Sequence, residues 1–136
     1  MNQLLSSLEV FYHKLQAYHW YVKGLNFFTL HTQFESYYDQ IAHQIDTVAE
    51  TMLMVGQEPI STLSEFLELS TIKEAEHGYV SGKHVLVALK ADFTELYNQA
   101  KAIQAEGNVV VSPVMDELIA SYSKAVWMIS QALIEE

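Results

Sequence analysis

Apolar residues recur at alternating spacings of three and four positions along almost the whole chain, which is the period of an amphipathic helix. Four stripes follow this spacing: Leu4, Leu8, Phe11, Leu15, Tyr18 and Val22; Leu30, Phe34, Tyr37, Ile41, Ile45, Val48, Met52 and Val55; Leu86, Leu89, Phe93, Leu96, Ala100 and Ile103; Met115, Leu118, Tyr122, Ala125, Ile129 and Leu133. A helix with one apolar face must bury that face against a neighbour. Four long amphipathic helices therefore predict a four-helix bundle.

Residues that break helices separate these stripes. Gly24, in "KGLN", interrupts the pattern between the first two helices, and the second helix is expected to stop at Gly56. The segment 61–70, "STLSEFLELS", predicts a short extra helix between helices two and three, with Ser61 or Thr62 as its N-cap.

The last helix is expected to begin at "SP", with Ser112 as N-cap and Pro113 in the first turn. The sequence thus predicts an all-α fold, a four-helix bundle with a short extra helix between helices two and three. With 136 residues, half of them apolar, the chain 1–136 is expected to form a single domain with a full hydrophobic core.

Composition limits where the protein acts and what it binds. The chain has no cysteine, which excludes disulfides, thiolate metal sites and cysteine nucleophiles and fits a reducing cytoplasm, where we expect the protein. Its start, "MNQLLSSLEV", does not resemble a signal peptide, and no run of apolar residues is long enough to predict a membrane span.

The charge of the chain also restricts its partners. The net charge is −10, from 7 basic and 17 acidic residues, and the lysines are scattered, with no basic cluster at either end. Such a chain attracts cations and repels nucleic acid phosphates, so DNA binding is not expected.

Two pairs of polar residues on the second helix suggest metal binding. His31 and Glu35 are four residues apart, as are Asp46 and Glu50, so each pair lies on one helix face. His19 stands on the other side of the turn from His31. Imidazole and carboxylate donors together suit first-row metals such as iron better than calcium or magnesium. From spacing alone, a surface ion pair or solvated carboxylates are the more common interpretation of either pair.

The two pairs lie on one stripe, which we call the second stripe of this helix: His31, Glu35, Tyr38, Ala42, Asp46, Ala49 and Leu53. It is turned about 100° from the core stripe, and its mixed composition indicates an interface. His31 and Asp46 are separated by roughly 22 Å along the axis, too far for one metal centre. An antiparallel two-fold dimer would bring the two half-sites together and create two identical shared sites.

The stretch "HWYVKGLNFFTLH", the later Asp46 and Glu50, and "DTVAETMLMVGQEPISTLSEFLE" resemble the signature of the Dps-type mini-ferritins, which belong to the ferritin-like superfamily. The resemblance is strong over residues 10 to 70 and looser, by helix pattern and "VWM", to the end. It implies a ferritin-like bundle that assembles as a homododecameric cage built from two-fold dimers.

The resemblance also implies the site and its activity. The ferroxidase ligands, for two irons, would be His19, His31 and Glu35 from one subunit and Asp46 and Glu50 from its two-fold mate. Glu35 stands where many members have aspartate. The protein would oxidise Fe(II) with hydrogen peroxide in preference to dioxygen and store the Fe(III) mineral.

Some features remain open beside this prediction. His43 is expected to be a helix-surface residue, and a further metal site at His77 or His84 is an alternative to simple exposure. Family cages admit iron through carboxylate-lined pores near the start of the last helix, where this chain offers only Asp116 and Glu117. Two alternative functions are a cage that buffers another metal such as zinc without turnover, and a DNA-compacting or cell-surface cage.

Overall fold

A computed structural model describes residues 1–135 as four long helices, one short helix and one pair of very short strands. The elements, in chain order, are α1 (Asn2–Tyr21), β1 (Val22–Lys23), α2 (Phe27–Met54), α3 (Leu63–Leu69), β2 (Val80–Ser81), α4 (Gly82–Gln104) and α5 (Val111–Leu133). None of these helices carries an apolar stretch long enough to cross a membrane in the part of the chain that the structure describes.

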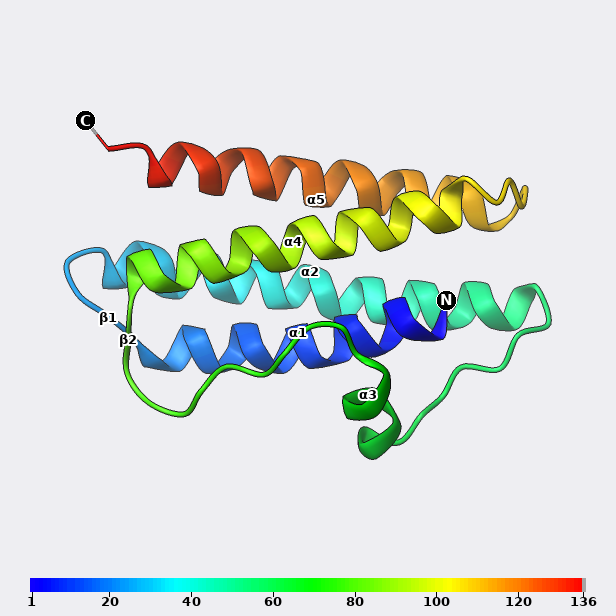
Figure 1. The fold of residues 1–136 in the computed structure, drawn as a ribbon, viewed down its shortest axis with the longest axis horizontal. Helices are drawn as coiled ribbons and strands as arrows, with labels where there is room; N and C mark the ends of the chain where they lie inside the picture. The colour runs from blue at the N-terminus through cyan, green and yellow to red at the C-terminus, as the bar shows by residue number, and fades with distance from the viewer. Residues whose placement is uncertain (136) are drawn as a thin grey trace.

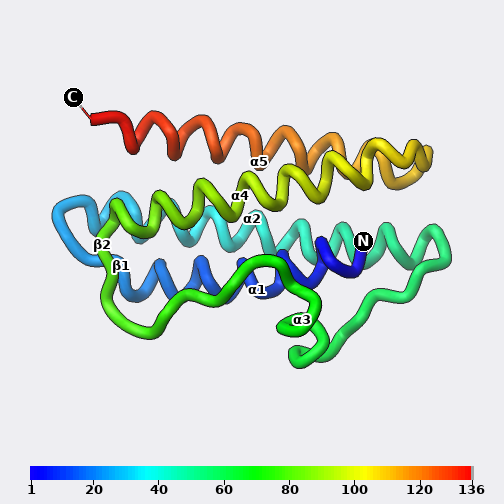
Figure 2. Tube along the Cα trace, viewed as in Figure 1, coloured from blue at the N-terminus to red at the C-terminus, as the bar shows by residue number. Residues whose placement is uncertain are grey.

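The four long helices pack as two antiparallel pairs, α1 with α2 and α4 with α5 (Figure 1). The connection from α2 to α4 returns along the whole length of the bundle, so α4 starts at the end where α2 starts (Figure 2). The short helix α3 lies in this connection and packs on the outside of α1. One long crossover of this kind is the arrangement of ferritin-like bundles.

The apolar stripes that predict the helices form the core. All residues of the first stripe are buried, as are the central residues of the other three except Ile45, which is partly buried. The other partly buried stripe residues lie near helix ends: Leu30, Val55, Leu86, Ile103 and Leu133. Because the buried positions keep the helical period through all four helices, the expected bundle is confirmed.

Two predicted helix ends are also confirmed. Gly56 has φ +80°, and the N–H groups of Gly56 and Gln57 donate to the carbonyls of Leu53 and Met52, which closes α2 with a Schellman motif. Thr62, rather than Ser61, caps α3.

The predicted N-cap of the last helix, Ser112, was wrong, whereas Pro113 lies in the first turn as expected. The helix begins one residue before Ser112, and the side-chain oxygen of Asn108 accepts hydrogen bonds from the N–H groups of Val110 (2.9 Å) and Val111 (3.1 Å). Ser112 Oγ instead donates to the carbonyl of Gln104 at the end of α4. The capping oxygen therefore comes from the loop residue Asn108, which follows the glycine turn.

The sequence did not predict the strand pair. Val22 pairs with Val80 and Lys23 with Ser81 in parallel, an element too short to produce an alternating pattern. This pair joins the α1–α2 turn to the segment that leads into α4, and so fixes the end of the bundle where the first predicted half-site lies.

Candidate metal centre

The turn between α1 and α2 brings His19 and His31 together. His19 lies in the last turn of α1 and His31 near the start of α2. Gly24, between them, has φ +119°, a conformation that a residue with a Cβ rarely adopts. The reversal at this glycine places the two helices side by side, so that residues twelve positions apart are in contact.

The two imidazole rings lie face to face. Their centroids are 3.7 Å apart and their planes differ by 12°. His19 Nδ1 lies 2.6 Å from the carbonyl oxygen of His31, and His31 Nδ1 lies 2.7 Å from the carbonyl oxygen of His19. Each histidine thus binds the backbone of the other, and the carbonyl of His19 belongs to the last turn of α1, where carbonyls lack helical partners.

These two bonds determine which ring nitrogens are free. A carbonyl oxygen can only accept a hydrogen bond, so Nδ1 of each neutral ring carries the proton. The lone pair of each neutral imidazole is then on Nε2, the atom that can bind a metal ion. Nδ1–H donated to a backbone carbonyl is the usual support of a metal-binding histidine.

Aromatic rings cover the pair on both sides. The ring of Phe27 stacks on His31 with a centroid distance of 5.0 Å, and the ring of Tyr38 meets His19 edge-on at 5.5 Å. His19 is 7% exposed, and His31 is partly buried. Phe27 and Tyr38 therefore hold the imidazoles in place. The sequence did not predict this role: Tyr38 was expected only at the interface, and Phe27 had no assigned role.

The third residue of this half-site, Glu35, is exposed one turn beyond His31 on α2. The hydroxyl of Tyr38 donates to Glu35 Oε1 over 3.3 Å. The pKa of Tyr38 is raised, first by burial and then by the neighbouring Glu35 charge and this hydrogen bond. Tyr38 therefore remains protonated, as its role as donor requires.

The other two predicted ligands lie elsewhere on α2. Asp46 and Glu50 are both exposed, and Asp46 is roughly 22 Å along the axis from His31. Within residues 1–135, no three histidine or acidic side chains are arranged to hold a metal ion in one chain. A site that uses all five predicted ligands therefore requires a second chain.

The second stripe of α2 lies at the surface of the single chain. Glu35, Ala42, Asp46 and Leu53 are exposed, and Tyr38 and Ala49 are partly buried. Leu53, the last residue of the stripe, is 61% exposed. The stripe thus remains available for contact with a partner.

The remaining histidines do not join the half-site. His43 is exposed on α2, and in the described part of the chain its side chain makes no ion pair. His77 packs edge-on against Tyr21, with centroids 5.3 Å apart, and the backbone N–H of His84 donates to the cap residue Ser81. Within the described residues, neither His77 nor His84 belongs to a group of histidine and acidic side chains that could hold a metal ion.

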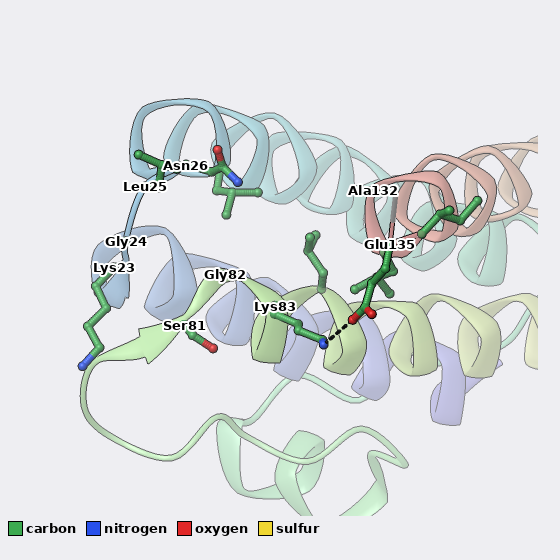
Figure 3. A pocket seen from close by; sticks show the side chains of 13 residues that line it. Lys23, Gly24, Leu25, Asn26, Ser81, Gly82, Lys83, Ala132 and Glu135 are labelled. Atoms are coloured by element: carbon green, nitrogen blue, oxygen red, sulfur yellow. Dashed lines mark hydrogen bonds and ion pairs between the residues drawn. The ribbon is translucent and has the colours of Figure 1, made fainter.

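A hollow of about 360 Å³ lies at the same end of the bundle, between the α1–α2 turn, the start of α4 and the end of α5 (Figure 3). An ion pair joins Lys83 and Glu135 across it, with Nζ and Oε1 3.0 Å apart. None of the five predicted ligands lines this hollow, so it is separate from the candidate metal centre.

The sequence of this chain is similar to those of a known protein family. The model of the ferritin-like domain family matches residues 1–135. The DNA protection during starvation protein 2 of Bacillus anthracis is 35% identical over 132 residues, which cover 95% of this chain and 90% of that protein.

Solved structures agree with this relationship. The crystal structure of Dps from Staphylococcus aureus superimposes with a TM-score of 0.93 at 40% identity, covering 99% of this chain and 93% of that one. The Dps protein of Vibrio cholerae O1, described as a member of a broad superfamily of ferritin-like diiron-carboxylate proteins, has a TM-score of 0.93 at 32% identity, covering 98% of this chain and 86% of that one.

Proposed function

Because this chain belongs to the ferritin-like family and, within it, to the Dps proteins, we propose that it oxidises Fe(II) and stores the resulting Fe(III). The observation that carries the proposal is the reciprocal bonding of His19 and His31, which leaves both Nε2 atoms free to bind a metal. The diiron-carboxylate description of the Vibrio cholerae protein supports iron as the substrate.

Each site is shared between two subunits in this proposal. His19, His31 and Glu35 of one subunit face Asp46 and Glu50 of the partner subunit across a two-fold axis that passes α2 between Gln40 and Ile41. The second stripe of α2, exposed in the single chain, becomes buried in this dimer. Six such dimers form a cage of twelve subunits, which acts in the cytoplasm.

The donor set fits the chemistry of iron oxidation. Three carboxylates and two imidazoles can hold two Fe(II) ions, and carboxylates favour the higher charge of Fe(III). Hydrogen peroxide accepts one electron from each of the two Fe(II) ions, its O–O bond breaks, and with two protons it yields two water molecules. Because two electrons are taken together, no hydroxyl radical is released.

The protein's own part in this reaction is to bind and orient. The backbone carbonyls of His19 and His31 fix the two imidazoles in one tautomer, and Phe27 and Tyr38 fix the ring planes. A site arranged before the metal arrives spends less free energy on ordering its ligands.

An anaerobic titration with Fe(II), followed by addition of hydrogen peroxide, tests this function. We expect Fe(II) to bind at two ions per site, and peroxide to oxidise them rapidly at two Fe(II) per peroxide, as followed by the absorbance of Fe(III). Binding of Fe(II) without rapid oxidation by peroxide would contradict the ferroxidase proposal and favour a metal-buffering cage.

A further inference from the structure

We propose that Tyr38 is a positioning residue that holds the Glu35 carboxylate beside the two imidazoles, an inference that rests on the proposed function. Tyr38 touches two of the predicted ligands at once: its ring meets His19, and its hydroxyl donates to Glu35.

The ring of Tyr38 is held from two sides. It lies edge-on to His19, with a centroid distance of 5.5 Å and an interplanar angle of 83°, and edge-on to Tyr12 at 5.6 Å and 77°. Both distances are in the range of favourable aromatic pairs. The Tyr38 ring is thus anchored to α1 as well as to its own helix, and its hydroxyl has a defined position on the second stripe of α2.

The hydroxyl acts on a side chain that otherwise has few restraints. Glu35 is exposed and, in the described part of the chain, forms no ion pair. The hydrogen bond from Tyr38 engages Oε1 over 3.3 Å and leaves Oε2 open for a metal ion. Residues three apart on a helix lie on the same face, so this contact requires no change of the backbone.

The hydrogen bond from Tyr38 matters because the side chain of Glu35 is long. A glutamate has one more rotatable bond than an aspartate, so more conformational freedom is lost when its carboxylate binds a metal. The hydrogen bond from Tyr38 restricts this freedom before the metal binds. Partners that orient a metal ligand typically change metal affinity by about 10- to 100-fold. The bond from Tyr38 is long, at 3.3 Å, so its effect belongs at the lower end.

Anaerobic titration of the assembled protein with cobalt(II), in the absence of peroxide, measures metal affinity apart from the oxidation of iron. Because each proposed site holds two metal ions, we expect cobalt(II) to bind in two steps, one of them weaker. We expect Tyr38→Phe, which keeps the ring and removes the hydroxyl, to lower the affinity of the weaker step about 10-fold. Tyr37→Phe, a change in the neighbouring core tyrosine, should leave both cobalt(II) steps unchanged.

A second pair of proteins separates positioning from packing. In Glu35→Asp, the carboxylate is withdrawn by about one C–C bond, roughly 1.5 Å, and no longer reaches the Tyr38 hydroxyl. Adding Tyr38→Phe to Glu35→Asp should therefore have no further effect on cobalt(II) affinity. A loss of equal size in both backgrounds, or no loss in either, would overturn the role of Tyr38.

The failure of the proposed function would look different. If the wild-type protein showed no cobalt(II) binding, or if His31→Ala bound cobalt(II) as the wild type does, the site itself would be wrong and the role of Tyr38 would fall with it. If wild-type and His31→Ala proteins behave as proposed and only the Tyr38→Phe result disagrees, the function stands and this inference alone is overturned.

Discussion

His19 and His31 each donate Nδ1–H to the backbone carbonyl of the other, and their rings stack with centroids 3.7 Å apart. Because the acceptors are backbone atoms, removing one imidazole leaves the hydrogen bond of the other intact. The contribution of each ring to metal binding can therefore be measured in a variant whose remaining histidine keeps its tautomer.

The first prediction concerns the ligands. His31→Ala and Asp46→Ala should each slow peroxide-driven Fe(II) oxidation by more than about 10-fold, because loss of a ligand costs at least as much as loss of its support. The helical circular dichroism signal should be unchanged, since neither side chain belongs to the core. Stopped-flow absorbance of Fe(III) measures the rate.

His84→Ala is the matched control for this experiment. His84 is exposed at the start of α4, is not one of the five predicted ligands, and takes part in the cap only through its backbone. Its oxidation rate should equal that of the wild type. Normal rates in both His31→Ala and Asp46→Ala would remove the assignment of these residues as ligands.

The second prediction concerns DNA. The purified protein should not retard duplex DNA at about 150 mM salt near neutral pH, because a chain of net charge −10 repels the phosphate backbone. An electrophoretic mobility assay at two salt concentrations measures this. A retarded band that weakens as salt rises would contradict the prediction.

The third prediction concerns a hydrogen bond in the core. The hydroxyl of Tyr122 donates to Gln44 Oε1 over 2.8 Å, and both side chains are buried. Tyr122→Phe leaves this oxygen without its donor and should lower the free energy of unfolding by about 1–3 kcal/mol in chemical denaturation. Adding Gln44→Leu removes the unpaired oxygen and should recover part of the loss; a double variant less stable than Tyr122→Phe would contradict this explanation.

The fourth prediction concerns a buried ion pair between α1 and α4. Lys14 Nζ lies 2.8 Å from Asp92 Oδ2, with the side chains 9% and 13% exposed. Burial raises the pKa of Asp92, and the Lys14 ammonium lowers it in part. Lys14→Met removes the ammonium that lowers the pKa of Asp92, so this pKa should rise further. Near neutral pH the ionised Asp92 carboxylate would then be buried without its partner.

The pH dependence of this variant follows from the sign of the shift. A carboxyl whose pKa is higher in the folded state than its ordinary value of 3.8 keeps its proton longer in the folded state. The ionisation of Asp92 therefore lowers the free energy of unfolding as the pH rises from 3.8 through the raised pKa. Lys14→Met should cost about 3–5 kcal/mol near pH 7 and much less near pH 4. A cost equal at both pH values would contradict this, and adding Asp92→Asn should abolish the pH dependence.

The ferritin-like bundle was predictable from the sequence because burial follows the helical period at nearly every stripe position. The resemblance to the Dps-type mini-ferritins is confirmed by the match to the ferritin-like domain family and by the Dps relatives. The strand pair of Val22 and Val80 was not predictable, because two residues are too few for a periodic signal.

The five ligands remain a prediction from the sequence, which did not specify the geometry of the half-site in the single chain. Spacing places His19 and His31 on either side of a turn, yet only the structure shows that each binds the carbonyl of the other. The positioning contacts of Phe27 and Tyr38 depend on side-chain directions that no spacing rule specifies. The N-cap of α5 was mispredicted because the Asn108 side chain reaches across the loop to cap it.

The central claim is that each site is built by two subunits, and mixing two defective chains tests it most directly. A chain with His31→Ala and a chain with Asp46→Ala, carrying different tags, are co-expressed, and cages that contain both are purified. In a mixed dimer one site carries both changes, and the other has all five ligands.

The account predicts that mixed cages regain peroxide-driven Fe(II) oxidation, at up to roughly one quarter of the wild-type rate when the two chains pair at random. Cages of either chain alone should remain slow. Mixed cages with confirmed mixed dimers but no activity above that of the separate variants would contradict a site shared across the two-fold axis.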